Sequence, residues 1–138
     1  MFIKETSKPI SDFPFPKLNE YTQGIFPTQL FTVASGSGAG KSTICRELAY
    51  HFLVKRNLKI GYIGLEESVQ RTLQGLVGID LNIPLHLAAE ETVDQDELKK
   101  SFDRLTSTRN LFLYNHFGSL EPDTLLEQIR YLATVDGV

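Results

Sequence analysis

The sequence predicts an α/β fold in which a parallel sheet is flanked by helices. Short apolar, β-leaning runs at 30–34, 60–65 and 111–114 alternate with helix-like stretches over short links, an order that is typical of parallel sheets. The run at 60–65 is continuously apolar, as expected for a strand that is buried on both faces. Only three strands are legible, so we expect the sheet to be incomplete.

Composition limits the class of protein. The chain has 138 residues, is 41% hydrophobic and carries a net charge of −3, which suits one soluble globular domain and argues against a large basic nucleic-acid surface within it. No apolar run approaches the ~20 residues needed to span a bilayer, and no signal peptide is evident. The single cysteine, Cys45, excludes an intrachain disulfide; we interpret it as a packed side chain rather than a reactive thiol.

The N-terminal residues differ from the rest. Residues 1–20 contain Pro9, Pro14 and Pro16 and little periodicity, which indicates an arm or linker. It is either a disordered tail or an arm that docks on a neighbour. We place the domain itself at 21–138.

A glycine-rich loop follows the first expected strand. It comprises Ser35, Gly36, Ser37, Gly38, Ala39, Gly40, Lys41, Ser42 and Thr43. A strand, a glycine-rich loop and then Lys-Ser at a helix start is the context of a nucleotide-binding phosphate loop. The glycines let backbone N–H groups approach phosphate oxygens, and the helix N-terminus adds partial positive charge.

Two side chains of this loop have expected roles. Lys41 can reach the β- and γ-phosphates, and the Ser42 hydroxyl can ligate a Mg²⁺ that bridges them. The motif G-x-x-x-x-G-K-[ST] expects a glycine at Ser35; a serine can hold a turn there through its hydroxyl, so we interpret the loop as a variant. The alternative is a glycine-rich turn with a lysine beside it.

Four helices are expected to cover the sheet. The first runs over 41–56 and ends near Asn57, and the second over 68–77, with Gly78 as its stop. The third, over 93–107, is capped by Thr92, and the last, over 122–136, has Pro122 in its first turn and ends at Gly137. The inward residues by helical spacing are Ile44, Leu48 and Phe52; Val69, Leu73, Leu76 and Val77; Leu98, Phe102 and Leu105; and Leu125, Ile129 and Leu132. We interpret His51, beside the first stripe, as a surface or core-edge imidazole rather than a ligand.

Glu66 is the second candidate for chemistry. It follows the strand at 60–65, and ligands of open parallel sheets bind beyond the carboxyl ends of the strands. A carboxylate there can polarise the water that attacks a γ-phosphate. The alternative is an acid that merely favours a helix start. Glu67 is the weaker candidate, because we expect it to be turning into the helix already.

At this point the chain resembles a known family. The residues 18–22, 35–43, Leu65-Glu66-Glu67-Ser68 and 111–114 are similar to the N-terminal half of the RecA-like motor of hexameric replicative helicases. Within this DnaB-like superfamily they are most similar to bacteriophage primase-helicases and Twinkle. The phosphate loop alone is widespread, but its spacing to Leu-Glu-Glu-Ser is specific.

The resemblance implies a helicase motor that binds Mg²⁺ with ATP or another NTP or dNTP, works as a homo-hexameric ring and translocates on single-stranded DNA. It implies that Glu66 is the catalytic base and that Lys41 serves catalysis. It also implies a cytoplasmic protein, in the host cytoplasm if a phage encodes it, with no membrane partner.

The resemblance also implies functional elements that are not found in this sequence. The Walker B aspartate, the phosphate sensor, the DNA-binding loops and the arginine finger are expected beyond Val138, because the sequence ends where the Walker B strand should begin. The chain is therefore either the nucleotide-binding half of a motor that a C-terminal half or other helicase subunits complete, and inactive alone, or a non-catalytic fragment that binds nucleotide or helicase subunits. A small P-loop kinase is a weaker alternative, since no acceptor site or lid is recognisable.

Overall fold

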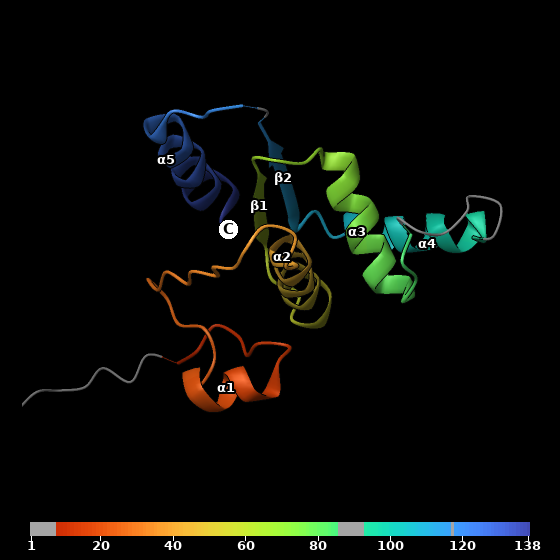
Figure 1. The fold of residues 1–138 in the computed structure, drawn as a ribbon, viewed down its shortest axis with the longest axis horizontal. Coiled ribbons are helices and arrows are strands. Elements are labelled where there is room, and N and C mark those ends of the chain that lie inside the picture. Colours follow the sequence, from red (N-terminus) through yellow and green to blue (C-terminus); the bar gives the residue numbers. More distant parts are fainter. Residues whose placement is uncertain (1–7, 86–92, 117) are drawn as a thin grey trace, which may run out of the picture.

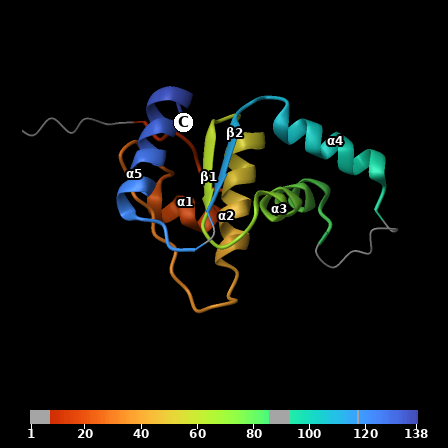
Figure 2. The same cartoon turned by 90° about the horizontal axis from the view of Figure 1, so that it is seen from above.

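The computed structural model describes residues 8–85, 93–116 and 118–138. Its elements are α1 (Pro16–Thr22), α2 (Lys41–Tyr50), the π-helical turn η1 (His51–Lys55), β1 (Ile60–Gly64), α3 (Val69–Leu81), α4 (Gln95–Thr106), β2 (Leu111–Asn115), α5 (Pro122–Tyr131) and the π-helical turn η3 (Leu132–Asp136). They form a mixed α/β arrangement with α5 on one side of the two strands and α2 and α3 on the other (Figures 1 and 2).

The sheet of the described residues has two parallel strands. β1 pairs with β2 in register from Ile60 opposite Leu111 to Gly64 opposite Asn115, which confirms the second and third predicted strands and their parallel direction. Gly61 lets the C-terminal helix approach β1, since a Cβ at this position would lie 2.9 Å from Leu132 Cδ1. Each strand therefore has one neighbour, and each is an edge within the part of the chain described.

The first predicted strand is wrong: residues 30–34 have no strand structure. In Figure 1 this segment leads up to α2 and is not drawn as a strand. Leu30 is 92% exposed, and Phe31 and Val33 are also exposed. A strand forms only where its backbone groups hydrogen-bond to a neighbouring strand. Among the described residues β1 and β2 pair only with each other. Residues 30–34 therefore have side chains that favour a strand but no strand to pair with.

The helix after the loop was predicted correctly in extent but not in its buried face. α2 begins at Lys41 and continues through η1 to Lys55, and Asn57 follows with a left-handed φ of 52°. Its buried residues are Ala49 and Leu53, whereas Ile44 is 37% exposed. The reason is that α2 packs against α3 through the Ala49 face, which leaves the predicted stripe at the border.

The second helix begins as predicted but ends later. Ser68 caps it, and its Oγ accepts a hydrogen bond from the Arg71 N–H at 3.2 Å. Gly78 is not its stop: it is buried inside α3, which ends at Asn82 with φ 55°. A Cβ at Gly78 would lie 2.8 Å from the Ile83 carbonyl oxygen, so this glycine provides room for the returning chain.

The third helix is capped by Asp94, whose Oδ1 accepts from the Asp96 N–H at 2.8 Å; Thr92, the predicted cap, lies outside the described residues. Leu105 is fully buried as predicted, but Phe102 is 45% exposed and Ser101 is buried instead. The helix is turned toward Ser101 because that hydroxyl donates to Asp80 of α3 at 2.6 Å.

The last helix has Pro122 in its first turn and ends at Gly137 with φ 68°, as predicted. Leu125 and Leu132 are half-buried, whereas the predicted inward residue Ile129 is 48% exposed. A layer of two strands is too narrow to cover the whole apolar face of this helix.

Asp80 joins three helices in one polar cluster. Its carboxylate accepts hydrogen bonds from Tyr50 of α2 at 2.9 Å and from Ser101 of α4, and it forms an ion pair with Arg104. Burial disfavours its charge, but the hydrogen bonds from Arg104, Ser101 and Tyr50 outweigh burial and lower the Asp80 pKa. Burial and the bond to Asp80 raise the pKa of Tyr50 to about 12.

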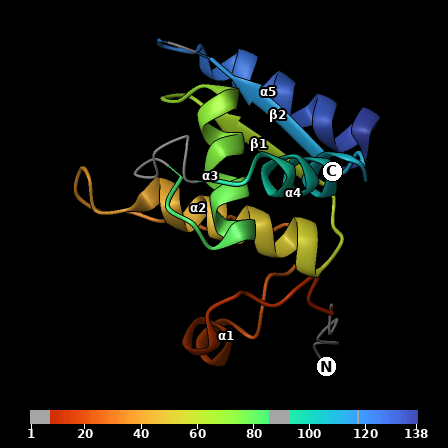
Figure 3. The same ribbon diagram turned by 90° about the vertical axis from the view of Figure 1, so that its right-hand side faces the viewer.

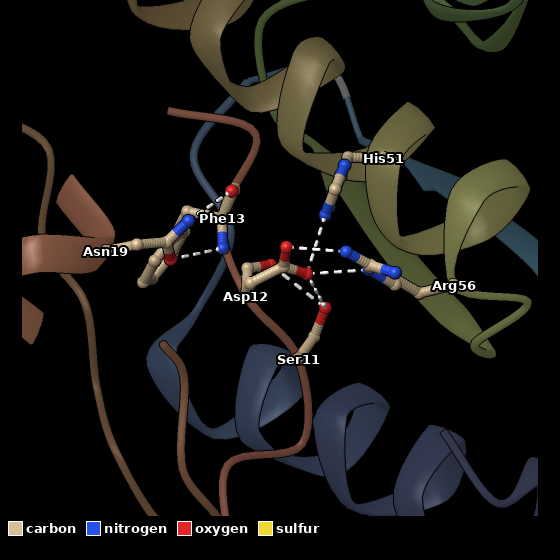
Figure 4. Close-up of polar contacts among 6 residues, drawn as sticks. All are labelled: Ser11, Asp12, Phe13, Asn19, His51 and Arg56. Atoms are coloured by element: carbon tan, nitrogen blue, oxygen red, sulfur yellow. Dashed lines mark hydrogen bonds and ion pairs between the residues drawn. The ribbon is translucent and has the colours of Figure 1, made fainter. Parts of the chain in front are cut away.

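The N-terminal segment folds back on its own chain. Asp12 forms an ion pair with Arg56 and lies 3.2 Å from His51 Nε2, while Asn19 exchanges two 2.7 Å hydrogen bonds with the Phe13 backbone (Figure 4). The Phe13 ring is 3% exposed and packs against Phe31, with ring centroids 5.0 Å apart. From residue 8 on, the predicted arm therefore docks on the chain itself; its boundary at residue 20 stays a prediction.

Candidate phosphate-binding site

The glycine-rich loop ends where α2 begins. Gly40 is the residue before the helix, with φ 95°, and Gly38 has φ 73°. Both values lie in the left-handed region that favours glycine, so this loop shape depends on glycine at these two positions. The N–H groups of the first helical turn have no intrahelical partner and face the loop end of the helix.

The side chain of Lys41 bends back over the loop. Its Nζ donates to the carbonyl oxygens of Ser35 and Gly36, both at 2.9 Å. The hydroxyl of Ser35 donates to the Gly36 carbonyl oxygen at 3.2 Å, which confirms that this serine holds the turn through its own hydroxyl. The loop therefore keeps its cation at its centre.

The loop has room for an anionic group. A Cβ at Gly36, Gly38 or Gly40 would meet nothing within 4 Å, and residues 35–39 are all exposed. Ser42 is exposed in the first turn of α2. Among the described residues no three His, Cys, Asp or Glu side chains gather to hold a metal; one hydroxyl beside a phosphate site still suits Mg²⁺, which takes most of its ligands from phosphate and water.

Glu66 lies between β1 and the cap of α3. Its side chain is exposed and makes no hydrogen bond or ion pair with any residue that the structure describes. The carboxyl ends of both strands and the loop end of α2 lie on the same side of the molecule, at the left in Figure 3. Glu66 is thus a carboxylate without a partner among the described residues, on the side where the glycine-rich loop opens.

Glu67 is engaged in contacts. It forms an ion pair with Arg46 of α2 and accepts from Thr72 Oγ1 at 2.9 Å and from the Tyr62 hydroxyl at 3.4 Å. Burial and the Glu67 charge raise the pKa of Tyr62 to about 12. The expectation that Glu67 already belongs to the helix is wrong, because α3 begins at Val69. Glu67 differs from Glu66 through its partners.

Sequence reasoning missed Arg46 and Gly75. The Arg46 side chain crosses α3 at Gly75, where a Cβ would lie 2.6 Å from Arg46 Nε. A glycine within an otherwise regular amphipathic helix is a signal of close approach, and it could have drawn attention to this crossing. A groove of about 880 Å³ opens between α2 and α3 beside it; its lining includes Thr43, Arg46, Ser68, Arg71 and Gln74.

Comparison with known proteins identifies the family. The sequence model of the DnaB-like helicase C-terminal domain matches residues 12–137. The chain belongs to this family. It is 32% identical over 127 residues to a DNA helicase/primase of Enterobacteria phage T3, covering 85% of this chain, and 30% identical over 80 residues to the replicative DNA helicase DnaB of Leifsonia xyli, covering 58%.

The DnaB-like chain spans about a fifth of these relatives: 21% of the phage protein and 18% of the bacterial one. The match agrees with the resemblance found in the sequence. Among the described residues no helix is long and apolar enough to cross a membrane.

Proposed function

We propose that the chain is the nucleotide-binding part of a DnaB-type replicative helicase motor, which couples NTP hydrolysis to movement along single-stranded DNA. The observation that carries the proposal is an open glycine-rich loop at a helix start, on the same side as the free carboxylate of Glu66. The names of both relatives describe DNA helicases, and this supports the assignment of that site to a helicase motor.

Each loop residue has a role in this proposal. Backbone N–H groups of residues 35–43 bind the phosphates, and Lys41 exchanges its carbonyl partners for phosphate oxygens. Mg²⁺, held by Ser42 together with phosphate oxygens and water, would neutralise the charge that develops on the phosphates. Glu66 accepts the proton of the attacking water, since it alone of the two adjacent glutamates lacks a partner among the described residues.

The rest of the motor is proposed to come from further polypeptide. The two-stranded sheet and the exposed segment 30–34 leave positions for additional strands. A completed ring of such subunits would act on single-stranded DNA in the cytoplasm, in the host cytoplasm if a phage encodes it.

The test uses the motor assembled from this chain and the polypeptide that completes it. Phosphate release is measured with single-stranded DNA for the parent, for Glu66→Gln and for Glu67→Gln. We expect Glu66→Gln to lower turnover about 10²- to 10⁴-fold, the usual contribution of a general base, while nucleotide stays bound. Unchanged turnover in Glu66→Gln would remove Glu66 as the base. Nucleotide binding without turnover in every assembly would favour a non-catalytic fragment.

A further inference from the structure

The contact between Arg46 and Glu67 joins the two halves of the candidate site. Arg46 belongs to α2, which begins at the glycine-rich loop, and Glu67 belongs to the segment between β1 and α3. The side chains are 18% and 15% exposed, and they form an ion pair. An Arg–carboxylate pair that is mostly shielded from water holds its geometry better than a surface pair.

The Arg46 side of this contact is linked to Ser42. The two residues are four positions apart on α2, so their side chains lie on the same helix face, one turn from each other. Arg46 is therefore carried by the same helix that places Ser42 at the phosphate loop.

The Glu67 side is linked to Glu66. Glu67 accepts hydrogen bonds from Thr72 and Tyr62 besides its ion pair, and its carbonyl oxygen would lie 3.3 Å from a Cβ at Gly64. Glu66, next to it in the chain, has no partner of its own among the described residues. The direction in which Glu66 points therefore depends on how its neighbour is held.

The position of Arg46 is also energetically unfavourable in one respect. Its Nε is buried and has no hydrogen-bond partner in the part of the chain that the structure describes, and a buried unsatisfied donor is unfavourable. Gly75 is the residue whose missing Cβ permits this route across α3. A fold that needed only packing at this place would be better served by an apolar side chain.

We propose that Arg46 and Glu67 are positioning residues that set Glu66 relative to the phosphate loop, through the ion pair between them. The inference rests on the proposed function of Glu66. Loss of the pair leaves the nucleotide-binding groups in place but lets the 65–68 segment move, so turnover falls while nucleotide affinity is kept. Misplacement of a reacting group by about 1 Å can cost about 10²-fold in rate.

The first experiment is a double-mutant cycle in the assembled motor, with phosphate release and binding of a fluorescent nucleotide as readouts. Glu67→Gln is expected to lower turnover about 10- to 100-fold with nucleotide affinity unchanged, and Arg46→Lys, which keeps the charge, to lower it less. In a Glu66→Gln background the same Glu67→Gln change should have no further effect, because it acts through Glu66.

The matched control is the ion pair between Asp80 of α3 and Arg104 of α4. Asp80→Asn breaks a contact between helices but touches neither Glu66 nor the loop, so turnover of the folded motor should be unchanged. A second measurement uses the 138-residue chain alone: hydrogen exchange in residues 65–68 should accelerate in Glu67→Gln and not in Asp80→Asn.

Each outcome decides between the two proposals. If Glu66→Gln lowers turnover and Glu67→Gln does not, the positioning inference is overturned and the role of Glu66 stands. If Glu66→Gln has no effect on turnover, the proposed role of Glu66 is overturned, and with it the positioning inference that rests on it. If Glu67→Gln and Arg46→Lys both unfold, or if both lower nucleotide affinity as much as turnover, the pair serves the fold and the inference is also overturned.

Discussion

Gly75 of α3 lies against the side chain of Arg46 from α2, and a Cβ at Gly75 would stand 2.6 Å from Arg46 Nε. Gly75→Ala should therefore push Arg46 away from Glu67. Two effects oppose each other. The higher helix propensity of alanine stabilises the chain by about 1 kcal/mol, but the displaced ion pair and the strain destabilise it by more. We therefore expect the free energy of unfolding to fall by about 1 kcal/mol. The measurement is denaturant unfolding of the chain.

The effect of Gly75→Ala on stability should change sign in a second background. The three atoms nearest to a Cβ at Gly75 all belong to Arg46, so with Arg46→Ala already present Gly75→Ala should stabilise the chain by about 1 kcal/mol. A loss of stability in both backgrounds would mean that Arg46 is not what makes glycine necessary at this position.

Lys41 should be essential for nucleotide binding. Its Nζ is held at the centre of the loop by two carbonyl oxygens, and each charge-assisted hydrogen bond that it could make to phosphate is worth about 1.5–3 kcal/mol. Lys41→Ala should weaken binding about 10²-fold or more and leave unfolding nearly unchanged, because the hydrogen bonds of its side chain go to exposed loop residues. A binding titration checks this, with Lys100→Ala on α4 as control; equal affinity in Lys41→Ala and the parent would contradict the loop's role.

The cluster around Asp80 should make stability depend on acid pH. Its pKa is lowered below the ordinary 3.8, so the folded state binds the proton less readily than the unfolded one. The stabilisation is thus present above 3.8 and is lost as pH falls through the folded-state pKa. Asp80→Asn should cost about 2 kcal/mol near neutral pH and flatten the acid decline of the melting temperature. Asp12→Asn removes a second carboxylate whose pKa is lowered and should affect this decline independently.

Much of this structure could be predicted from the sequence, because local patterns specified it. The apolar runs of β1 and β2, the start of α3 near Ser68 and the helix ends at Asn57 and Gly137 follow from propensity and turn chemistry within a few residues. The glycine-rich loop was predicted for the same reason. Its glycines and its lysine act on groups that lie nearby in the chain.

The predictions that were wrong depend on contacts between residues far apart in the sequence. Residues 30–34 have side chains that favour a strand but pair with no strand within the described chain. A local sequence pattern cannot show that the neighbouring strand is absent. The buried faces of α2 and α4 were misjudged because the small residues Ala49 and Ser101 are buried there. Glu67 was ranked below Glu66 for its expected place in the helix, which is wrong; its contacts, above all the one with Arg46, 21 residues away, are what distinguish it from Glu66.

The segment at 30–33 should promote association. Leu30 is 92% exposed, with Phe31 and Val33 also exposed beside it, and β1 and β2 are both edges in the described sheet. Exposed apolar residues and open strand edges both favour association with another chain. Leu30→Asp should reduce self-association in sedimentation experiments, whereas Leu126→Asp on α5, where the leucine is 59% exposed, should matter less. A parent chain that sediments as a stable monomer would contradict this expectation.

Turnover by the 138-residue chain alone should be very low, whatever its affinity for nucleotide. The chain offers the loop, Ser42 for Mg²⁺ and Glu66 for the water, but a motor also needs an arginine that acts on the transferred phosphate, and such a residue is commonly worth about 10³ to 10⁵ in rate. Adding the complementary polypeptide and single-stranded DNA should therefore raise phosphate release by several orders of magnitude. The control adds the same polypeptide to Lys41→Ala, which should show little turnover because we expect its nucleotide affinity to be strongly reduced. Robust hydrolysis by the chain alone would show that its own residues complete the site, and the proposal that further polypeptide supplies the missing groups would be abandoned.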